Sequence, residues 1–113
     1  MHEVSVMQQA LELALEQAGC QGASRIHRIA LRVGTLSGVV PEALEFAFDV
    51  VSRGTIAEGA RLDVERVPVL CSCPACGLEF RPAEPDYDCP RCLRPRTRVV
   101  QGRELELAFL EVS

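Results

Sequence analysis

Two cysteine pairs of the form Cys-x-x-Cys constrain this chain more than any other feature of its sequence. They are Cys73-Pro-Ala-Cys76 and Cys89-Pro-Arg-Cys92, and twelve residues separate them. Five of the seven prolines also fall within residues 73–95, so a helix is not expected there. A segment this short cannot bury a sufficient hydrophobic core of its own. It therefore needs a cross-link in order to fold.

The spacing of the cysteines indicates what that cross-link is. A Cys-x-x-Cys turn places two thiolates on one side of a tight loop, and two such loops complete a tetrahedral shell of sulfurs. Zinc favours this shell in closed structural sites, at Zn–S distances of about 2.3 Å. We therefore predict a structural zinc ion held by Cys73, Cys76, Cys89 and Cys92. Disulfides, an iron–sulfur cluster and a redox-active Cys-x-x-Cys motif remain as alternatives.

Two further cysteines and a run of arginines need a separate interpretation. Cys71 lies two residues before Cys73 and is interpreted as a free thiol, with a fifth, exchangeable metal ligand as the alternative. Cys20 has no partner in the sequence and is interpreted as a plain thiol. The basic run is expected to be a solvated hairpin, although it would also suit an acidic partner or nucleic acid; it comprises Arg91, Arg94, Arg96 and Arg98.

Composition excludes several classes of protein. The 113 residues carry 16 acidic and 12 basic side chains, with one tyrosine and no tryptophan, which argues against a general nucleic-acid binder. No apolar run approaches the ~18 residues of a membrane span, and the start does not resemble a signal peptide. We therefore expect a cytoplasmic protein without membrane contact. No phosphate-binding glycine loop or nucleophile–base set is present, so we expect no enzyme.

Hydrophobic periodicity predicts the secondary structure. Apolar residues at helical spacing predict a helix over residues 5–18, capped by Ser5 and Gln8, with residues 1–4 as a short arm. A second helix is expected from Pro41 to near Gly54. Alternation predicts strands over residues 26–33, 61–69 and 104–112; in the last, Leu105, Leu107 and Phe109 share one face.

This order of elements predicts an α+β fold. The simplest arrangement is a small three-stranded mixed sheet with two helices on one face. The cysteine-rich segment is then an irregular, zinc-ribbon-like module inserted before the last strand. We therefore expect residues 1–69 and 100–113 to form one domain and residues 70–99 to form the zinc-binding module.

The amino terminus offers a second group of metal ligands. A methionine followed by a bulky histidine is expected to stay in place, so the chain begins Met1-His2-Glu3. The Met1 amine and the His2 amide close one chelate ring, the His2 amide and imidazole close a second, and the Glu3 amide supplies a fourth nitrogen. Four nitrogens in a plane suit Ni(II) or Cu(II), which favour square-planar fields. The alternative is a frayed chain end without function.

These features together resemble one known family. The Met1-His2-Glu3 start with its amphipathic helix, residues 31–65, and the CSCPACGLEF and CPRC segments are similar to the HypA/HybF hydrogenase nickel-incorporation (maturation) proteins. The resemblance implies a nickel metallochaperone that delivers Ni(II) for maturation of [NiFe]-hydrogenase and, in some bacteria, urease. It implies as partners a HypB-type nickel GTPase, the hydrogenase large subunit and urease accessory proteins. A zinc-ribbon adaptor for nucleic acid or transcription machinery is the alternative function.

The resemblance also assigns residues. It makes His2 the nickel ligand, with the Met1 amine and the His2 and Glu3 amides as backbone donors, in a nickel-binding α+β domain. It makes the four paired cysteines zinc ligands. We expect the protein to be a monomer or a homodimer. Leu93 departs from the family, which often has glycine there, so we expect the second cysteine turn to be shaped differently. His27 matches no ligand position and is expected to be a surface or pocket histidine.

Overall fold

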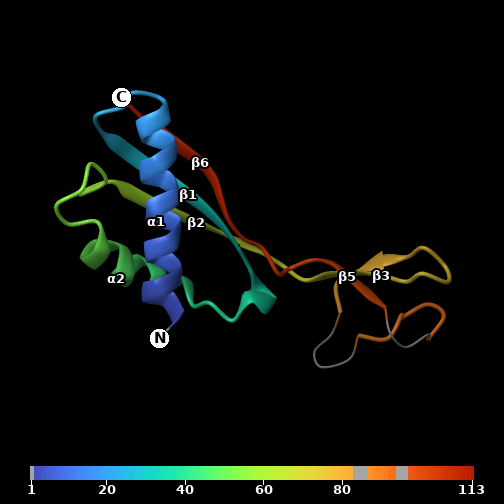
Figure 1. The fold of residues 1–113 in the computed structure, drawn as a ribbon. Helices are drawn as coiled ribbons and strands as arrows, with labels where there is room; N and C mark the ends of the chain where they lie inside the picture. The colour runs from blue at the N-terminus through green and yellow to red at the C-terminus, as the bar shows by residue number, and fades with distance from the viewer. Residues whose placement is uncertain (1, 83–86, 94–96) are drawn as a thin grey trace.

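The computed structural model describes residues 2–82, 87–93 and 97–113. The chain is elongated, 54 × 28 × 16 Å, with a helical body at one end and a cysteine module at the other (Figure 1). The helical body comprises α1 (His2–Cys20), β1 (Ile26–Gly34), η1 (Thr35–Ser37), α2 (Pro41–Val51), β2 (Arg61–Val67) and β6 (Leu105–Val112). The cysteine module runs from β3 (Leu70–Ser72) through β4 (Glu79–Phe80) to β5 (Arg98–Gln101).

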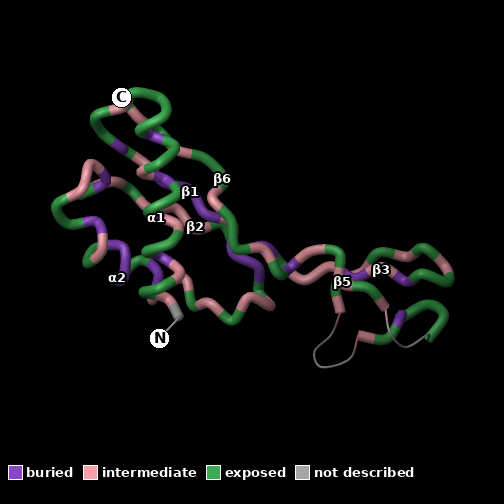
Figure 2. The backbone as a smooth tube through the Cα atoms, in the orientation of Figure 1, coloured by how far each residue is buried: buried purple, intermediate pink, exposed green. Residues whose placement is uncertain are grey.

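The helical body is built on the predicted three-stranded mixed sheet. Its order is β2-β1-β6, with β1 parallel to β2 and antiparallel to β6. The helix α1 packs against α2 and β6, and α2 also contacts β2. The core between helices and sheet is the run of buried residues seen in Figure 2, which includes Met7, Leu11, Ile29, Leu31 and Phe48. The α+β prediction is thus confirmed.

The helix α1 begins earlier than the sequence predicts. It starts at His2, so the expected arm of residues 1–4 and the Ser5–Gln8 cap are wrong. Glu3 lies in the first turn, where a negative charge complements the positive end of the helix dipole. Its Oε2 also accepts a hydrogen bond from the Val40 backbone N–H at 3.2 Å, which ties the turn to the segment before α2. Glu3, rather than Ser5, therefore stabilises the start of this helix.

The boundaries of the next elements follow their prolines. The helix α2 has Pro41 in its first turn, as expected, and buries Leu44, Ala47 and Phe48. The strand β2 ends at Val67 rather than at residue 69, because Pro68 has no N–H to continue the strand pairing. The second helix is confirmed, and the predicted 61–69 strand is two residues too long.

A β-bulge in β6 reverses its predicted side-chain pattern. The register shifts between Ala30, opposite Phe109, and Leu31, opposite Leu107, so Ala108 is an extra residue. Beyond the bulge Leu110 and Val112 face the core. Phe109 lies on the other face, where the Arg28 guanidinium sits 4.7 Å from its ring centre. The prediction that Phe109 shares a face with Leu105 and Leu107 is therefore wrong.

The cysteine module contains a sheet that the sequence did not predict. The strands β3, β4 and β5 pair antiparallel in the order β4-β3-β5. The expectation of an irregular segment is wrong because the prolines lie outside these three short strands and leave their backbone N–H groups free to pair. The buried Cys71 sits in the middle strand, opposite Phe80 and Val99.

Two glycines meet where the module joins the body. A side chain on Gly34 would place its Cβ 2.1 Å from the carbonyl oxygen of Gly102. That oxygen accepts a hydrogen bond from the Leu36 N–H at 2.7 Å, and the Gly34 N–H donates to the Glu104 carbonyl at 2.7 Å. On its other side Gly102, at a φ of +118°, faces Val69. The two segments that connect the body to the module are residues 68–69 and 102–104. They therefore cross at the end of β1, with their backbones in direct contact.

Candidate metal centre

The first cysteine turn follows β3 directly. The Cys73 N–H donates to the Leu78 carbonyl at 2.9 Å, and the Gly77 N–H donates to the Cys73 carbonyl at 2.8 Å. Gly77 has a φ of +77°, in the left-handed region that glycine adopts without steric cost. The loop is thereby closed by backbone hydrogen bonds, with Cys73 buried and Cys76 half-buried.

The second cysteine turn repeats the first. The Leu93 N–H donates to the Cys89 carbonyl at 2.9 Å, and the Cys92 N–H points to the Cys89 Sγ at 3.5 Å. Leu93 has a φ of +61°, close to the value at Gly77. The expectation that this turn is shaped differently is therefore wrong, because the leucine takes up the left-handed conformation. Leu93 bears the steric cost of that conformation on a side chain that is 75 % exposed.

The two turns bring their four sulfurs together. The Sγ atoms of Cys73, Cys76, Cys89 and Cys92 all lie within 4.8 Å of one another. Cys73 and Cys92 are 3.4 Å apart, and Cys76 and Cys89 are 3.7 Å apart. A tetrahedron of sulfurs with Zn–S distances of about 2.3 Å has edges of about 3.8 Å. The four thiols can thus hold one metal ion, and Cys71 is not a member of this group.

The surroundings favour thiolates. The pKa of Cys76 is lowered to about 6, chiefly by the Leu78 backbone N–H and next by the Arg91 guanidinium. The pKa of Cys89 is also lowered, and the Cys92 backbone N–H is the main cause. Because a thiolate is the form that binds metal, these hydrogen bonds prepare the group for ligation.

Sequence reasoning missed the contact that joins the two turns. Arg91 belongs to the second pair, yet its Nη2 donates to the backbone carbonyl of Cys76 in the first pair at 2.8 Å. The sequence shows Arg91 only as part of a basic run. Of that run Arg98 is exposed, whereas Arg94 and Arg96 lie outside the described residues.

The predicted amino-terminal ligands are only partly described. Met1 and the side chain of His2 lie outside the described part of the structure, whereas Glu3 is half-buried in the first turn of α1. The pKa of Glu3 is lowered, first by its own backbone N–H and then by that of Val40. The helical body holds α1, so this end and the cysteine module belong to different parts of the molecule (Figure 1).

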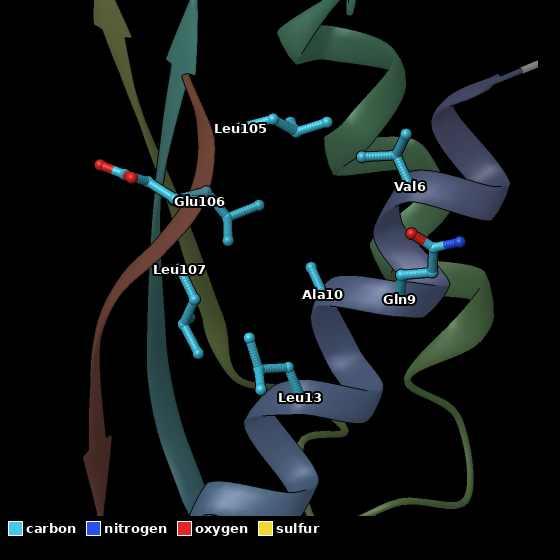
Figure 3. Close-up of a pocket in the computed structure, with 8 residues that line it drawn as sticks. Val6, Gln9, Ala10, Leu13, Leu105, Glu106 and Leu107 are labelled. Atoms are coloured by element: carbon cyan, nitrogen blue, oxygen red, sulfur yellow. The ribbon is translucent and has the colours of Figure 1, made fainter.

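Other candidate groups lie apart from both sites. Cys20 is an exposed thiol at the end of α1. His27 is exposed, and its Nε2 lies 2.7 Å from the Ser113 Oγ, so it is a surface histidine as expected. An apolar cavity of about 370 Å³ between α1 and β6 contains neither cysteine nor histidine in its lining (Figure 3). Its walls are formed by Val6, Gln9, Ala10, Leu13, Leu31, Leu105, Glu106 and Leu107.

Known proteins match this arrangement over the whole chain. Residues 1–112 match the family described as "Hydrogenase/urease nickel incorporation, metallochaperone, hypA". The hydrogenase maturation factor HypA of Picosynechococcus sp. is 45 % identical over 112 residues, which cover 99 % of each chain. The factor of the same name from Chloroflexus aurantiacus is 44 % identical over 112 residues and 98 % of each chain.

Two solution structures have the same fold. That of the Ni metallochaperone HypA from Helicobacter pylori has a TM-score of 0.70 and 28 % identity, covering 97 % of this chain and 96 % of that one. Another, described as HypA protein, has a TM-score of 0.77 and 29 % identity, covering 100 % and 97 %.

These matches, taken with the four-cysteine centre, define a metallochaperone of hydrogenase maturation rather than an enzyme. The chain belongs to the HypA family of hydrogenase maturation factors. None of the helices described in this structure combines the length and the apolar composition that a membrane span requires.

Proposed function

We propose that this chain binds Ni(II) at its amino terminus and delivers it for maturation of [NiFe]-hydrogenase. Its membership of a nickel-incorporation family and its Met1-His2-Glu3 start support this proposal. The ligands are the Met1 amine, the His2 and Glu3 amides and the His2 imidazole. Four nitrogens in one plane favour Ni(II) over Zn(II), which has no such geometric preference.

The observation that carries the proposal is the start of α1 at His2. The first four N–H groups of a helix have no acceptor within the helix. The His2 and Glu3 amides belong to this set, so deprotonating them for nickel breaks no backbone hydrogen bond between helical turns; the Glu3 N–H gives up only its contact with the Glu3 carboxylate. Loss of the two amide protons also cancels the charge of the dication, so the complex does not oppose the positive end of the helix dipole.

We further propose that Cys73, Cys76, Cys89 and Cys92 hold a structural zinc ion. The donor set fits, since four sulfurs within 4.8 Å match the closed tetrahedral shell of structural zinc sites. When bound, the ion cross-links the two cysteine turns and adds folding free energy of roughly 10–16 kcal/mol in comparable peptides. Residues 70–99 are then the zinc-binding module, and residues 1–69 and 100–113 the nickel-binding domain. The strand β5 spans the second boundary.

The partners we propose follow from the family. They are a HypB-type nickel GTPase and the large subunit of [NiFe]-hydrogenase, with urease accessory proteins as further recipients where urease is present. The protein acts in the cytoplasm, where those enzymes are assembled. Hydrogenase maturation is the part of this role that the family establishes.

Nickel titration of the untagged protein tests the nickel site. We expect one Ni(II) per chain and an X-ray absorption edge typical of square-planar nitrogen ligands. His2→Ala removes the imidazole and is expected to abolish this site, and so is acetylation of the Met1 amine. His27→Ala is the matched control, because it removes the chain's other histidine from an exposed position outside both sites. Unchanged nickel affinity in His2→Ala would refute the proposal.

A further inference from the structure

The two cysteine turns are joined by a contact that does not involve sulfur. The Nη2 of Arg91 donates to the Cys76 carbonyl at 2.8 Å, so the side chain reaches from the second turn to the backbone of the first. The thiol pairs Cys73–Cys92 and Cys76–Cys89 also connect the two turns. Arg91 is therefore a non-ligand side chain that hydrogen-bonds one cysteine turn to the other.

The position of Arg91 also places a cation beside a concentrated negative charge. Four thiolates around Zn²⁺ carry a formal charge of −2, and the partly exposed pair Cys76 and Cys92 faces solvent. A guanidinium is always protonated and presents several N–H groups in a fixed plane. It can therefore satisfy a backbone carbonyl and attract the neighbouring thiolates at the same time.

We propose that Arg91 is a positioning residue for the four-sulfur centre: it locks the two cysteine turns together and holds a cation beside the sulfur ligands. The proposal rests on the zinc site proposed above. It predicts that Arg91 slows metal loss without contributing a ligand. Residues that orient metal ligands typically change metal affinity by about 10–100-fold when they are removed. Since Arg91 is exposed, we expect an effect near the lower end of that range.

The experiment measures zinc release and the Co(II) spectrum of the full chain. Zinc loss to a chromogenic chelator is followed for wild type and for Arg91→Ala, and we expect about tenfold faster loss in the variant. The Co(II)-substituted variant should keep the bands of four sulfur ligands. Its sulfur-to-metal charge-transfer band should move to lower energy, because removing a cation beside the thiolates raises the energy of their lone pairs.

Three further variants separate the causes. Arg91→Lys keeps the charge and is expected to restore the charge-transfer energy and part of the release rate. Arg91→Gln keeps a donor without charge, so its band should stay at lower energy. Arg81→Ala is the matched control, since it removes an exposed arginine of the same module and should behave as wild type.

The outcomes distinguish this inference from the zinc assignment. Wild-type protein that binds neither zinc nor Co(II) through four sulfurs overturns the zinc site and this inference with it. A wild type that binds both metals, with Arg91→Ala matching Arg81→Ala in release rate and spectrum, overturns the role of Arg91 alone. Should Arg91→Ala fail to fold, the test is the energy of the charge-transfer band in Arg91→Lys and Arg91→Gln. Equal band energies in these two variants would overturn the proposed role of Arg91.

Discussion

Gly34→Ala tests whether the crossing between module and body is as tight as the structure indicates. The new Cβ would lie 2.1 Å from the Gly102 oxygen, 2.2 Å from its carbon and 2.6 Å from the Arg103 nitrogen. All three are backbone atoms and cannot rotate away. The φ and ψ of Gly34, −74° and 147°, suit alanine, so the cost is entirely one of space.

The size of the effect follows from what must move. The connecting segment has to retreat by roughly 1 Å to reach the 3.0 Å below which real Cβ contacts are essentially never found. The two 2.7 Å hydrogen bonds that close the crossing would then be lost. At up to about 1.5 kcal/mol each, their loss costs about 3 kcal/mol of unfolding free energy. For a domain of this size, that lowers the melting temperature by on the order of 10–20 °C.

Thermal unfolding followed by far-ultraviolet circular dichroism measures the change, with the zinc-loaded protein throughout. Gly19→Ala is the matched control, because Gly19 lies in α1 with no neighbouring atom within 4 Å of a new Cβ. This control should be stabilised by at most about 0.5–1 kcal/mol, because Gly19 is the penultimate residue of α1. A Gly34→Ala protein that melts within about 2 °C of wild type would show that the crossing is not close-packed.

Three further predictions concern the two metal sites. Leu93→Gly removes the steric cost of the left-handed conformation, about 1–2 kcal/mol. The greater conformational freedom of glycine in the unfolded chain offsets about half of that gain. Zinc binding should therefore tighten about 2–5-fold in chelator competition; Leu93→Ala, which keeps the strain, should not tighten. Zinc removal by a chelator should abolish amide protection at Cys71 and Val99 but keep it at Leu31, as hydrogen exchange can show. The lowered pKa of Glu3 means that its hydrogen bond to Val40 is present above the usual value of 4.5 and is lost as the pH falls through the lowered one. A Val40 amide resonance in wild type that moves no more with acid than in Glu3→Gln would contradict this.

The sequence predicted those parts of the fold that depend on local periodicity. The helical spacing from Met7 to Ala18 and the alternation of β1 each identify a buried face, and both faces are in the core. The Cys-x-x-Cys spacing likewise predicted which four sulfurs meet. In each case the signal is the spacing of the residues themselves, so no knowledge of distant contacts is needed.

Long-range contacts and the closure of one turn explain what the sequence did not predict. The bulge at Ala108 is set by the register of β6 against β1, and alternation within β6 alone cannot locate it. The start of α1 depends on Glu3, which accepts a hydrogen bond from Val40, 37 residues further along the chain. The left-handed Leu93 is required by closure of the second turn, although leucine gives no sign of that conformation.

The burial pattern explains why the cysteine module needs its centre. In the helical body the buried residues are mainly aliphatic and come from both helices and the sheet (Figure 2). The buried apolar residues described in the module are instead three cysteines, Cys71, Cys73 and Cys89. Two of these belong to the four-sulfur group, so removing the metal would leave one buried thiol at the centre of a three-stranded sheet of short strands. A sheet that small is not stable through apolar burial alone. The module should therefore fold with its metal and unfold without it, while the body remains folded.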